Sequence, residues 1–306
     1  MALAQISNLD QLYGVDKLPN LNKIIELKQA SYPSMKDVLF NTESTNSEIY
    51  QTTTLSGVKN PVVRAELETV EFDTIKQGYS NTITVAERSA GYAISKVTLD
   101  RKKYNFVDRA TKSFAKGSFE EKEYNLAGIF DDAFTTVGYD GKVLCATDHP
   151  LENGFGGVNS NLGTAAAFSK TSFAALRNVL QNQVDEDGRK LNYMSAYIVH
   201  PQALQDSVRE VLGSMYNPDN ANNTINTMYD YTNVLPGVGY WPYLTDTNSF
   251  FLTCPKEDTG LMHVQGEAYN VEYDYDMHTR VHKYSSHEIY GYGVSHHRGI
   301  VGNAGA

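Results

Sequence analysis

The fold is decided by residues 100–161, a stretch whose second half opens with Gly138-Tyr-Asp-Gly-Lys-Val-Leu-Cys-Ala-Thr-Asp-His-Pro-Leu151. In its first half, between Tyr104 and Thr136, apolar residues recur at steps of three and four, the spacing of one buried helical face. They are Val107, Ala110, Phe114, Leu126, Ala127, Ile129, Phe130, Ala133 and Phe134. A helix of about 33 residues would be about 50 Å long, which favours an elongated molecule.

Gly117 and Ser118 interrupt this helical pattern. Glycine costs about 1 kcal/mol relative to alanine inside a helix, so the stretch is expected to form either one kinked helix or two helices. The turn-rich half that follows contains Asp140-Gly141, a pair that suits a tight turn.

The residues before this stretch begin with a polar, mixed segment that reaches about residue 45. Leu21 to Gln29 predicts one short helix that ends near Pro33, but so short a helix is marginal in water on its own. We therefore expect an N-terminal arm that orders on a neighbouring subunit, with a partly disordered tail as the alternative.

Between Glu48 and Val97 the apolar period changes to two, which indicates strands. A hairpin is expected, with Gly78 near its tip and a clean alternation over residues 65–72. A long two-stranded hairpin is barely stable alone, so it must pack on its own body or on another subunit. The expected strands are Ile49–Leu55, Val62–Phe72 and Thr82–Ala86.

Helices and strands alternate after residue 161. Helices are expected at Phe168–Val184, with Ser169 or Thr171 as the N-terminal cap, and at Gln202–Leu212. Strands therefore flank a central block of helices and strands at both ends, and the fold class is α+β. The later strands are expected at Ala196–His200, Phe250–Cys254 and Leu261–Val264, and by alternation within Ala268–Val294.

The composition is that of a globular protein. The 306 residues, 41% of them hydrophobic, are enough to bury the core of one large or two modest domains. A formal charge of −10 and a pI near 5.3 argue against a surface that grips nucleic-acid phosphates. No run of about 18 apolar residues predicts a membrane span, and the first residues lack the pattern of a secretory signal. We expect the protein to be made and used in a cytoplasm.

Cys145 and Cys254 have no C-x-x-C neighbour, so neither a disulfide framework nor a zinc module is implied. Two buried free thiols are expected, with one bond between them as the alternative. The 21 tyrosines stand against a single tryptophan, Trp241. Tyrosine is favoured both in interfaces and in strands, and the sequence leaves both interpretations open.

Three groups of polar residues are candidates for chemical sites, but no catalytic, cofactor-binding or metal residue is predicted. Asp148-His149 lies close to Cys145, but a Cys and a His four residues apart on a strand and turn do not bring sulfur and Nε2 together. Asp185-x-Asp187-Gly188 lacks the rest of a calcium loop and is expected to be a turn.

A group of histidines near the end of the chain suggests the alternative function. His282, His287, His296 and His297 match no familiar spacing of metal ligands. A hydrolase or metal-dependent enzyme that uses the His282–His297 region is nevertheless kept as the alternative.

Four passages carry a family resemblance. In their order and spacing they resemble the major capsid proteins of tailed phages, in particular head subunits of the Mu-like kind. The resemblance covers roughly residues 45–300, and no single motif carries it. The passages are Glu66-Leu-Glu-Thr-Val-Glu-Phe-Asp-Thr-Ile-Lys-Gln-Gly-Tyr79 with Gly91-Tyr-Ala-Ile-Ser95; Phe134 and Asp140-Gly-Lys-Val-Leu-Cys-Ala-Thr-Asp-His-Pro-Leu151 with Ser160-Asn161; Tyr197-Ile-Val-His-Pro201; and Tyr243-Leu-Thr-Asp-Thr-Asn-Ser-Phe250.

The resemblance implies the wedge-shaped Johnson (HK97-like) fold, with a spine helix at about 100–137. Some capsids of this fold crosslink a loop lysine to an asparagine of a neighbour. Lys59 and Lys76 lie in or near the loop, but no partner asparagine is identified, so this chemistry is not carried over. The expected parts are an N-terminal arm (1–47), an extended β-hairpin loop or E-loop (48–97), a peripheral domain with the spine helix (98–159 and 263–306) and an axial domain (160–262).

The implied function is that of a structural major capsid protein, with no enzyme activity and no cofactor. It would self-assemble as hexamers and pentamers into an icosahedral shell enclosing double-stranded DNA, which confinement holds without sequence-specific binding. Scaffold, portal and decoration proteins are the other expected partners, with scaffolding supplied by a separate protein or a removed segment. The protein would assemble in the host cytoplasm and reside in the virion. A tail-tube or decoration protein is a third interpretation, against which the length and the central helix argue.

Overall fold

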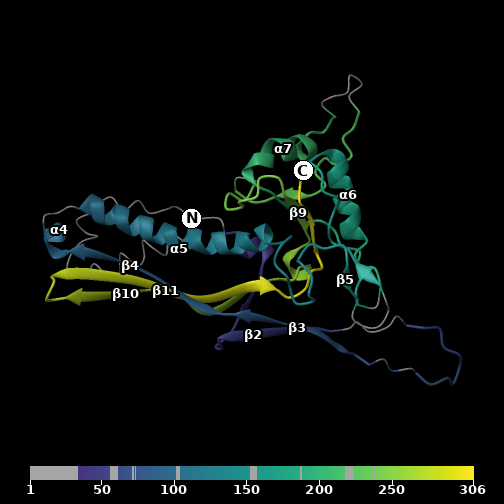
Figure 1. Ribbon diagram of the computed structural model, residues 1–306, viewed down its shortest axis with the longest axis horizontal. Coiled ribbons are helices and arrows are strands. Elements are labelled where there is room, and N and C mark those ends of the chain that lie inside the picture. Colours follow the sequence, from purple (N-terminus) through teal and green to yellow (C-terminus); the bar gives the residue numbers. More distant parts are fainter. Residues whose placement is uncertain are drawn as a thin grey trace.

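The computed structural model describes residues 34–55, 61–70, 72, 74–100, 104–151, 157–186, 188–217, 224–237 and 239–306. Figure 1 shows a flat layer, in which helix α5 (Tyr104–Asp131) lies along a sheet, and a second unit that meets the layer near the end of this helix. A ribbon of two strands, β2 (Ile49–Leu55) and β3 (Gln77–Thr84), runs out from beneath the place where they meet. The short helix expected at 21–29 lies outside the described residues.

The sheet of the flat layer has four strands in the order β1-β10-β11-β4. Strands β10 (Leu261–Asp276) and β11 (Val281–Val294) form a long antiparallel pair, and β4 (Ala86–Ser95) pairs antiparallel with β11. The short strand β1 (Asn41–Ser44) runs parallel to β10. The alternation in residues 269–275 thus belongs to one long strand, and α5 covers one face of the sheet (Figure 1).

Aromatic side chains join α5 to this sheet. Tyr92, Tyr284 and Tyr273 lie opposite one another on three neighbouring strands, with ring centroids 5.0 and 5.3 Å apart. The Tyr92 ring also meets Phe114 of α5 edge-on at 4.9 Å, and its hydroxyl lies 3.0 Å from that of Thr111. Edge-on and stacked aromatic pairs add about 0.5–1.5 kcal/mol each beyond the area that they bury, so this row helps to fix the helix on the sheet.

Helix α5 runs unbroken through Gly117 and Ser118 as one element of 28 residues. It ends at Asp131, so the prediction that it continues to Thr136 is wrong. The carbonyl of Ala133 accepts the amide of Cys145 at 2.9 Å instead of a helical amide. Ala133 is fully buried although it lies beyond the helix. The apolar pattern therefore outlasts the helix because the next turn packs in the same core.

The second unit is built on the sheet β12-β9-β7-β8 and two helices, α6 (Lys170–Gln181) and α7 (Gln205–Gly213). Ser169 forms a capping box with Ser172, which explains why α6 begins at Lys170 and not at Phe168. Phe173, Leu176 and Leu180 follow on the buried face. The strands are β7 (Tyr197–Val199), β8 (Asn233–Val234), β9 (Phe250–Thr253) and β12 (Ile300–Asn303).

One aromatic core joins the two units. Phe130, in the last turn of α5, meets Trp241 at 5.6 Å and Phe251 of β9 at 5.2 Å, both edge-on. Phe134 stacks on Phe251 at 5.4 Å. Burying a large apolar side chain contributes about 1.5–3 kcal/mol, so the end of the long helix is anchored in the second unit.

The β2–β3 ribbon differs from the expected hairpin. The described residues within Val62–Phe72 form no strand, and Leu67 has a positive φ of 65°. Gly78 lies within β3 and not at the tip. The alternation over residues 65–72 fails to make a strand because β2 pairs only with residues 77–84, leaving nothing in the described chain opposite it.

The remaining elements are short. Within the described part of the chain, no helix combines the length and the apolar character that crossing a bilayer requires. The short elements are α3 (Lys36–Leu39), α4 (Lys96–Asp100), the strand pair β5 (His149–Pro150) and β6 (Val158–Asn159), and the 3-10 helices Gln202–Leu204 and Lys256–Asp258.

Candidate functional sites

The tip of the β2–β3 ribbon is the first candidate site, because it exposes large apolar side chains. Val63, Leu67 and Phe72 are 103%, 98% and 91% exposed. Figure 1 shows that this part of the ribbon projects away from both units. A group of large apolar residues held in water marks an interaction surface. We call the set Val62, Val63, Leu67, Val70, Phe72 and Ile75 the ribbon tip.

The base of the ribbon rests on strand β11 at two glycines. A Cβ atom at Gly291 would lie 2.6 Å from the carbonyl oxygen of Thr84, and one at Gly293 would lie 2.9 Å from the Ile83 side chain. Only a residue without a side chain lets β3 cross so close to β11. The sequence Gly291-Tyr-Gly293 is therefore a requirement of the crossing.

Two further contacts hold the ribbon base. The side-chain amide of Asn81 donates to the carbonyl oxygen of Val294 at the end of β11. The ring of Tyr79 meets that of Tyr139 edge-on, with centroids 5.9 Å apart. Tyr139 belongs to the turn that precedes the second candidate site, so the ribbon base and that site are neighbours.

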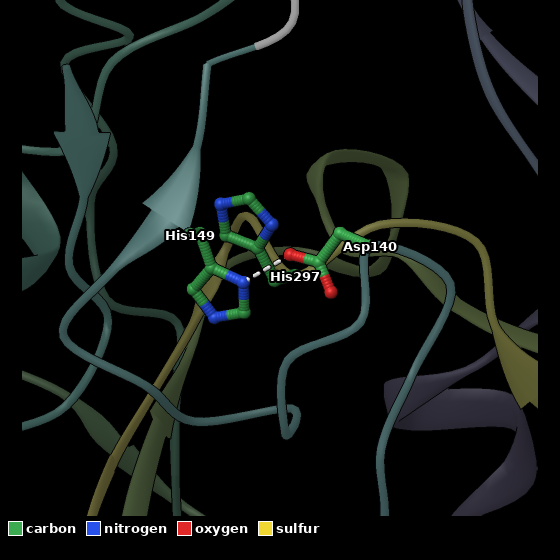
Figure 2. Close-up of side chains that lie close together, drawn as sticks. All are labelled: Asp140, His149 and His297. Carbon is green, nitrogen blue, oxygen red and sulfur yellow. Dashed lines mark hydrogen bonds and ion pairs between the residues drawn. The ribbon is translucent and has the colours of Figure 1, made fainter.

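The second candidate site is a cluster of Asp140, His149 and His297 (Figure 2). Asp140 Oδ2 lies 2.5 Å from His149 Nδ1. The two imidazole rings are stacked almost parallel, at 4° and with centroids 3.7 Å apart. Both histidines are buried, and three separate segments supply the cluster: the turn after α5, strand β5 and the loop between β11 and β12.

Hydrogen bonds around Asn161 define the protonation of His149. The Asn161 amide nitrogen donates to the carbonyls of Leu144 and His297, and its Oδ1 accepts the Ala146 amide. His149 Nε2 lies 3.1 Å from the same Oδ1 and must therefore donate to it. Nδ1 faces the Asp140 carboxylate, so both ring nitrogens of His149 face acceptors, the arrangement that suits a cationic imidazole in a buried ion pair.

Asp140 is held as a carboxylate by its neighbours. Burial raises the pKa of its carboxyl group, but the hydrogen bonds from His149 and from the Lys142 amide lower the pKa by more, and the net pKa lies below the usual value. The stacked neighbour, His297, is kept neutral. Burial, followed by the charges of His149, Arg298 and His296, holds the pKa of His297 well below its usual value.

His297 is fixed by two polar neighbours. The Asn159 amide nitrogen lies 3.3 Å from its Nε2, so with this amide orientation Nε2 accepts and Nδ1 carries the proton. The Tyr139 hydroxyl oxygen lies 2.7 Å from Nδ1 and also accepts the His297 amide at 3.2 Å. The cluster is therefore a cationic imidazole stacked on a neutral one.

The ligand atoms of Asp140, His149 and His297 lie within 4.8 Å of one another, a spacing that metal ligands have. The ring geometry does not fit a metal. An imidazole nitrogen binds zinc in the plane of its ring at about 2.0–2.1 Å, and two parallel rings 3.7 Å apart cannot both aim their lone pairs at one ion. The arrangement suits an ion pair with a stacked ring.

The structure shows where the candidate residues named in the sequence analysis lie. Cys145 and Cys254 are buried and free, which confirms the two thiols. Burial raises the pKa of both, that of Cys254 to about 12. Both nitrogens of His149 are occupied by Asp140 and Asn161, so they are not available to activate Cys145.

The terminal histidines do not form one group. His282 bonds to Tyr273 at 2.7 Å, and His287 lies 3.3 Å from Glu267, both on the long strands. Only His297 joins a polar cluster, with partners that the sequence did not suggest. Asp185 pairs with Arg189 across the predicted turn, whereas Asp187 lies outside the described residues.

A comparison with known families identifies the chain. Residues 78–303 match the model of a family described as phage capsid protein. The chain belongs to the phage capsid protein family. The matched region of this capsid protein begins in β3 and ends with β12. No curated protein matches it in sequence.

Solved structures agree on the fold of this capsid protein. The mature capsid of bacteriophage PhiM1 is similar over 90% of this chain and 88% of that one, with 12% identity and a TM-score of 0.56. The capsid of Ralstonia phage GP4 is similar over 86% and 85%, with 10% identity and a TM-score of 0.55. A chain of Microbacterium phage Oxtober96 is similar over 90% of this chain and 92% of that one, with 6% identity and a TM-score of 0.56. At such identities the likeness shows the fold, which confirms the α+β, HK97-like prediction.

The family also confirms the predicted class of function. The protein is a structural capsid protein of the virion, and the alternative of a hydrolase or metal-dependent enzyme has no support from the family or from these structures. The Mu-like subtype stays a prediction.

Proposed function

We propose that this capsid protein self-assembles as hexamers and pentamers into an icosahedral shell around packaged double-stranded DNA. The observation that carries the proposal is the exposed ribbon tip. Burying apolar surface contributes about 25 cal/mol per Å², so the tip gains stability when a sister copy covers it. A contact in which the tip is covered by a different surface of the sister copy would be heterologous, and such contacts can close rings of subunits.

We propose the division into arm (1–47), E-loop (48–97), peripheral domain (98–159 and 263–306) and axial domain (160–262). Helix α5 on the β10–β11 pair supports the peripheral part, and the sheet with α6 and α7 supports the axial part. Three strands cross these borders. Strand β1 of the arm pairs with β10, β4 pairs with β11, and β12 pairs with β9. The arm therefore joins the peripheral sheet at Asn41, the projecting part of the E-loop ends near Val85, and β12 lies in the axial sheet.

The remaining partners follow from this proposal. The formal charge of −10 favours DNA that is confined without sequence-specific contacts. Scaffold, portal and decoration proteins are the further partners that we propose, and the host cytoplasm is the proposed place of assembly. We propose that the chain is a head subunit of the Mu-like type.

Electron microscopy of the purified chain tests the proposal. The wild type is expected to form closed shells, and the double variant Leu67→Asp, Phe72→Asp is expected to form none, because two charges on the ribbon tip oppose its burial. Met194→Asp is the matched control, since Met194 is 68% exposed on another loop; shells should persist.

A wild-type chain that stays monomeric at high concentration and in crowding salt would contradict the proposal. Shells that form equally well with the double variant would remove the ribbon tip as the observation that carries it.

A further inference from the structure

We infer that the stacked rings of His149 and His297 fix, through Tyr139, the direction in which the ribbon leaves the body. Protonation of His297 would place a second positive charge on this pair and would release the ribbon base. The inference rests on the proposed function, because the ribbon is the element that would reach a sister copy. The two stacked histidines are buried and lie outside the ribbon itself (Figure 2).

A short chain of contacts connects the pair to the ribbon. Tyr79 of β3 packs edge-on against Tyr139. The Tyr139 hydroxyl is bound twice by His297, once to Nδ1 at 2.7 Å and once to the backbone amide at 3.2 Å. Three residues earlier, at the end of β11, the Val294 carbonyl accepts the side-chain amide of Asn81 of β3. The segment 294–297 therefore touches the ribbon base directly at Val294 and indirectly at His297, through Tyr139.

The two carboxylates of the described chain nearest to this site already have other partners. Asp140, which faces the pair, is bound to His149. Glu186, on the segment after α6, is bound to Arg298. The other titratable groups of the described chain whose charges act on His297 are His149, His296 and Arg298.

A proton added to His297 would change three contacts at once. Two cations would be stacked 3.7 Å apart in a buried site, where charges are weakly screened. Nε2 would become a donor facing the Asn159 amide, also a donor. Separating the rings would draw Nδ1 and the loop amide away from the Tyr139 hydroxyl. Tyr139 would lose its anchor, and Tyr79 would lose the fixed ring on which it packs.

Hydrogen–deuterium exchange of the full-length chain tests this coupling. Amides of β3 should lose protection by about tenfold, after correction for intrinsic rates, as the pH falls from 7 to 4, because local opening is read directly by exchange. Amides of β9, in the buried sheet of the second unit, should keep their protection and report that the chain is folded.

Two variants and one control separate the pair from a general effect of acid. His297→Gln removes the titrating ring and should flatten the pH profile of β3. Tyr139→Phe removes only the hydroxyl and should raise β3 exchange already at pH 7. His287→Gln is the control, since His287 lies on β11 beside Glu267 and away from the pair; it should keep the wild-type profile.

A wild-type pH profile in His297→Gln would overturn the inference. If that variant does not fold, unchanged β3 exchange in Tyr139→Phe at neutral pH would overturn it. If the chain forms shells but the exchange of β3 does not depend on pH, only this inference is contradicted. If the exchange of β3 depends on pH but the chain never forms shells, the proposed function is contradicted and the coupling is supported.

Discussion

The indole Nε1 of Trp241 donates a hydrogen bond to Oε2 of Glu123 at 3.2 Å, and both residues are 1% exposed. The other carboxylate oxygen accepts the Ser34 hydroxyl at 2.6 Å and the Met35 amide at 3.1 Å. One buried carboxylate on α5 thus binds the second unit and the first described residues of the chain. The described part of the proposed N-terminal arm is therefore held on its own body at this point.

Replacing Glu123 should cost stability in proportion to the donors left without a partner. We expect Glu123→Ala to lower the free energy of unfolding by about 3 kcal/mol, since each buried unpaired donor costs about 1–3 kcal/mol. Glu123→Gln keeps one acceptor oxygen and should cost about half as much. Urea unfolding of the unassembled chain measures both values.

The control for Glu123 is a carboxylate on the same helix. Glu120 forms a surface pair with Lys116, and both side chains are substantially exposed. Glu120→Ala should change the free energy of unfolding by less than about 0.5 kcal/mol. Equal losses for Glu120→Ala and Glu123→Ala would show that the buried hydrogen bonds carry no special weight.

The glycine crossing predicts a graded series. Gly291→Ala would place a Cβ atom 2.6 Å from the Thr84 carbonyl, which is backbone, whereas Gly293→Ala would meet the Ile83 side chain at 2.9 Å. We expect Gly291→Ala to displace the ribbon, to cost about 1–3 kcal/mol, and to abolish shells seen by electron microscopy. Gly293→Ala should cost less because Ile83 can adjust. The reverse order of severity would contradict the crossing.

Gly117 predicts a change in the opposite direction. It lies inside α5, and a Cβ atom there would meet nothing within 4 Å. Gly117→Ala should raise the free energy of unfolding by about 1 kcal/mol, because glycine loses more backbone freedom in a helix than alanine does. Thermal unfolding measures the gain. A loss of stability would mean that the helix needs flexibility at this position.

His263 predicts an acid-sensitive contribution to stability. It is fully buried, and neither ring nitrogen has a hydrogen-bond partner among the described residues. Burial, then the charges of Lys36 and Lys122, lowers its pKa from 6.5 to about 3. The unfolded chain therefore takes up a proton near pH 6.5 that the folded chain refuses until about pH 3. The stability present above pH 6.5 is lost as the pH falls through this window.

For His263 alone, the loss between pH 7 and pH 5 amounts to about 2 kcal/mol. His263→Phe can stack on Tyr290 as the imidazole does, and it should remove this part of the pH dependence. Urea unfolding at the two pH values measures the difference. His278→Phe, on the exposed turn between β10 and β11, is the control and should keep the wild-type slope. Equal slopes in all three proteins would contradict the assignment.

The elements that local chemistry specifies were predictable from the sequence. The apolar steps of α5 and the Ser169 cap of α6 both act within a few residues, and the structure confirms them. The end of α5 was not predictable, because Ala133 and Phe134 continue the apolar pattern in a turn that packs in the same core. The alternation over residues 65–72 predicted a strand, but a strand needs a neighbouring strand to pair with, and no described segment of this chain pairs with these residues.

The histidine cluster was beyond the reach of sequence spacing. Tyr139 and His297 lie 158 positions apart and meet only because β11 returns past the end of α5. Asp140 and His149 are close in sequence, yet Asp140 suggested only a turn, and His149 suggested only a doubtful pairing with Cys145. A buried ion pair produces no periodic pattern in the sequence, so its partners can be identified only once the fold is known.

The bare main chain of Gly291 and Gly293 gives the ribbon a smooth support. Side chains at these two positions would push β3 away from β11, whereas the glycines let the ribbon base lie directly against the main chain of β11. Backbone contact, together with the contacts of Asn81 and Tyr79, therefore sets the direction in which the ribbon leaves the body. In the proposed shell of pentamers and hexamers, this crossing is where any difference in ribbon direction between copies would arise.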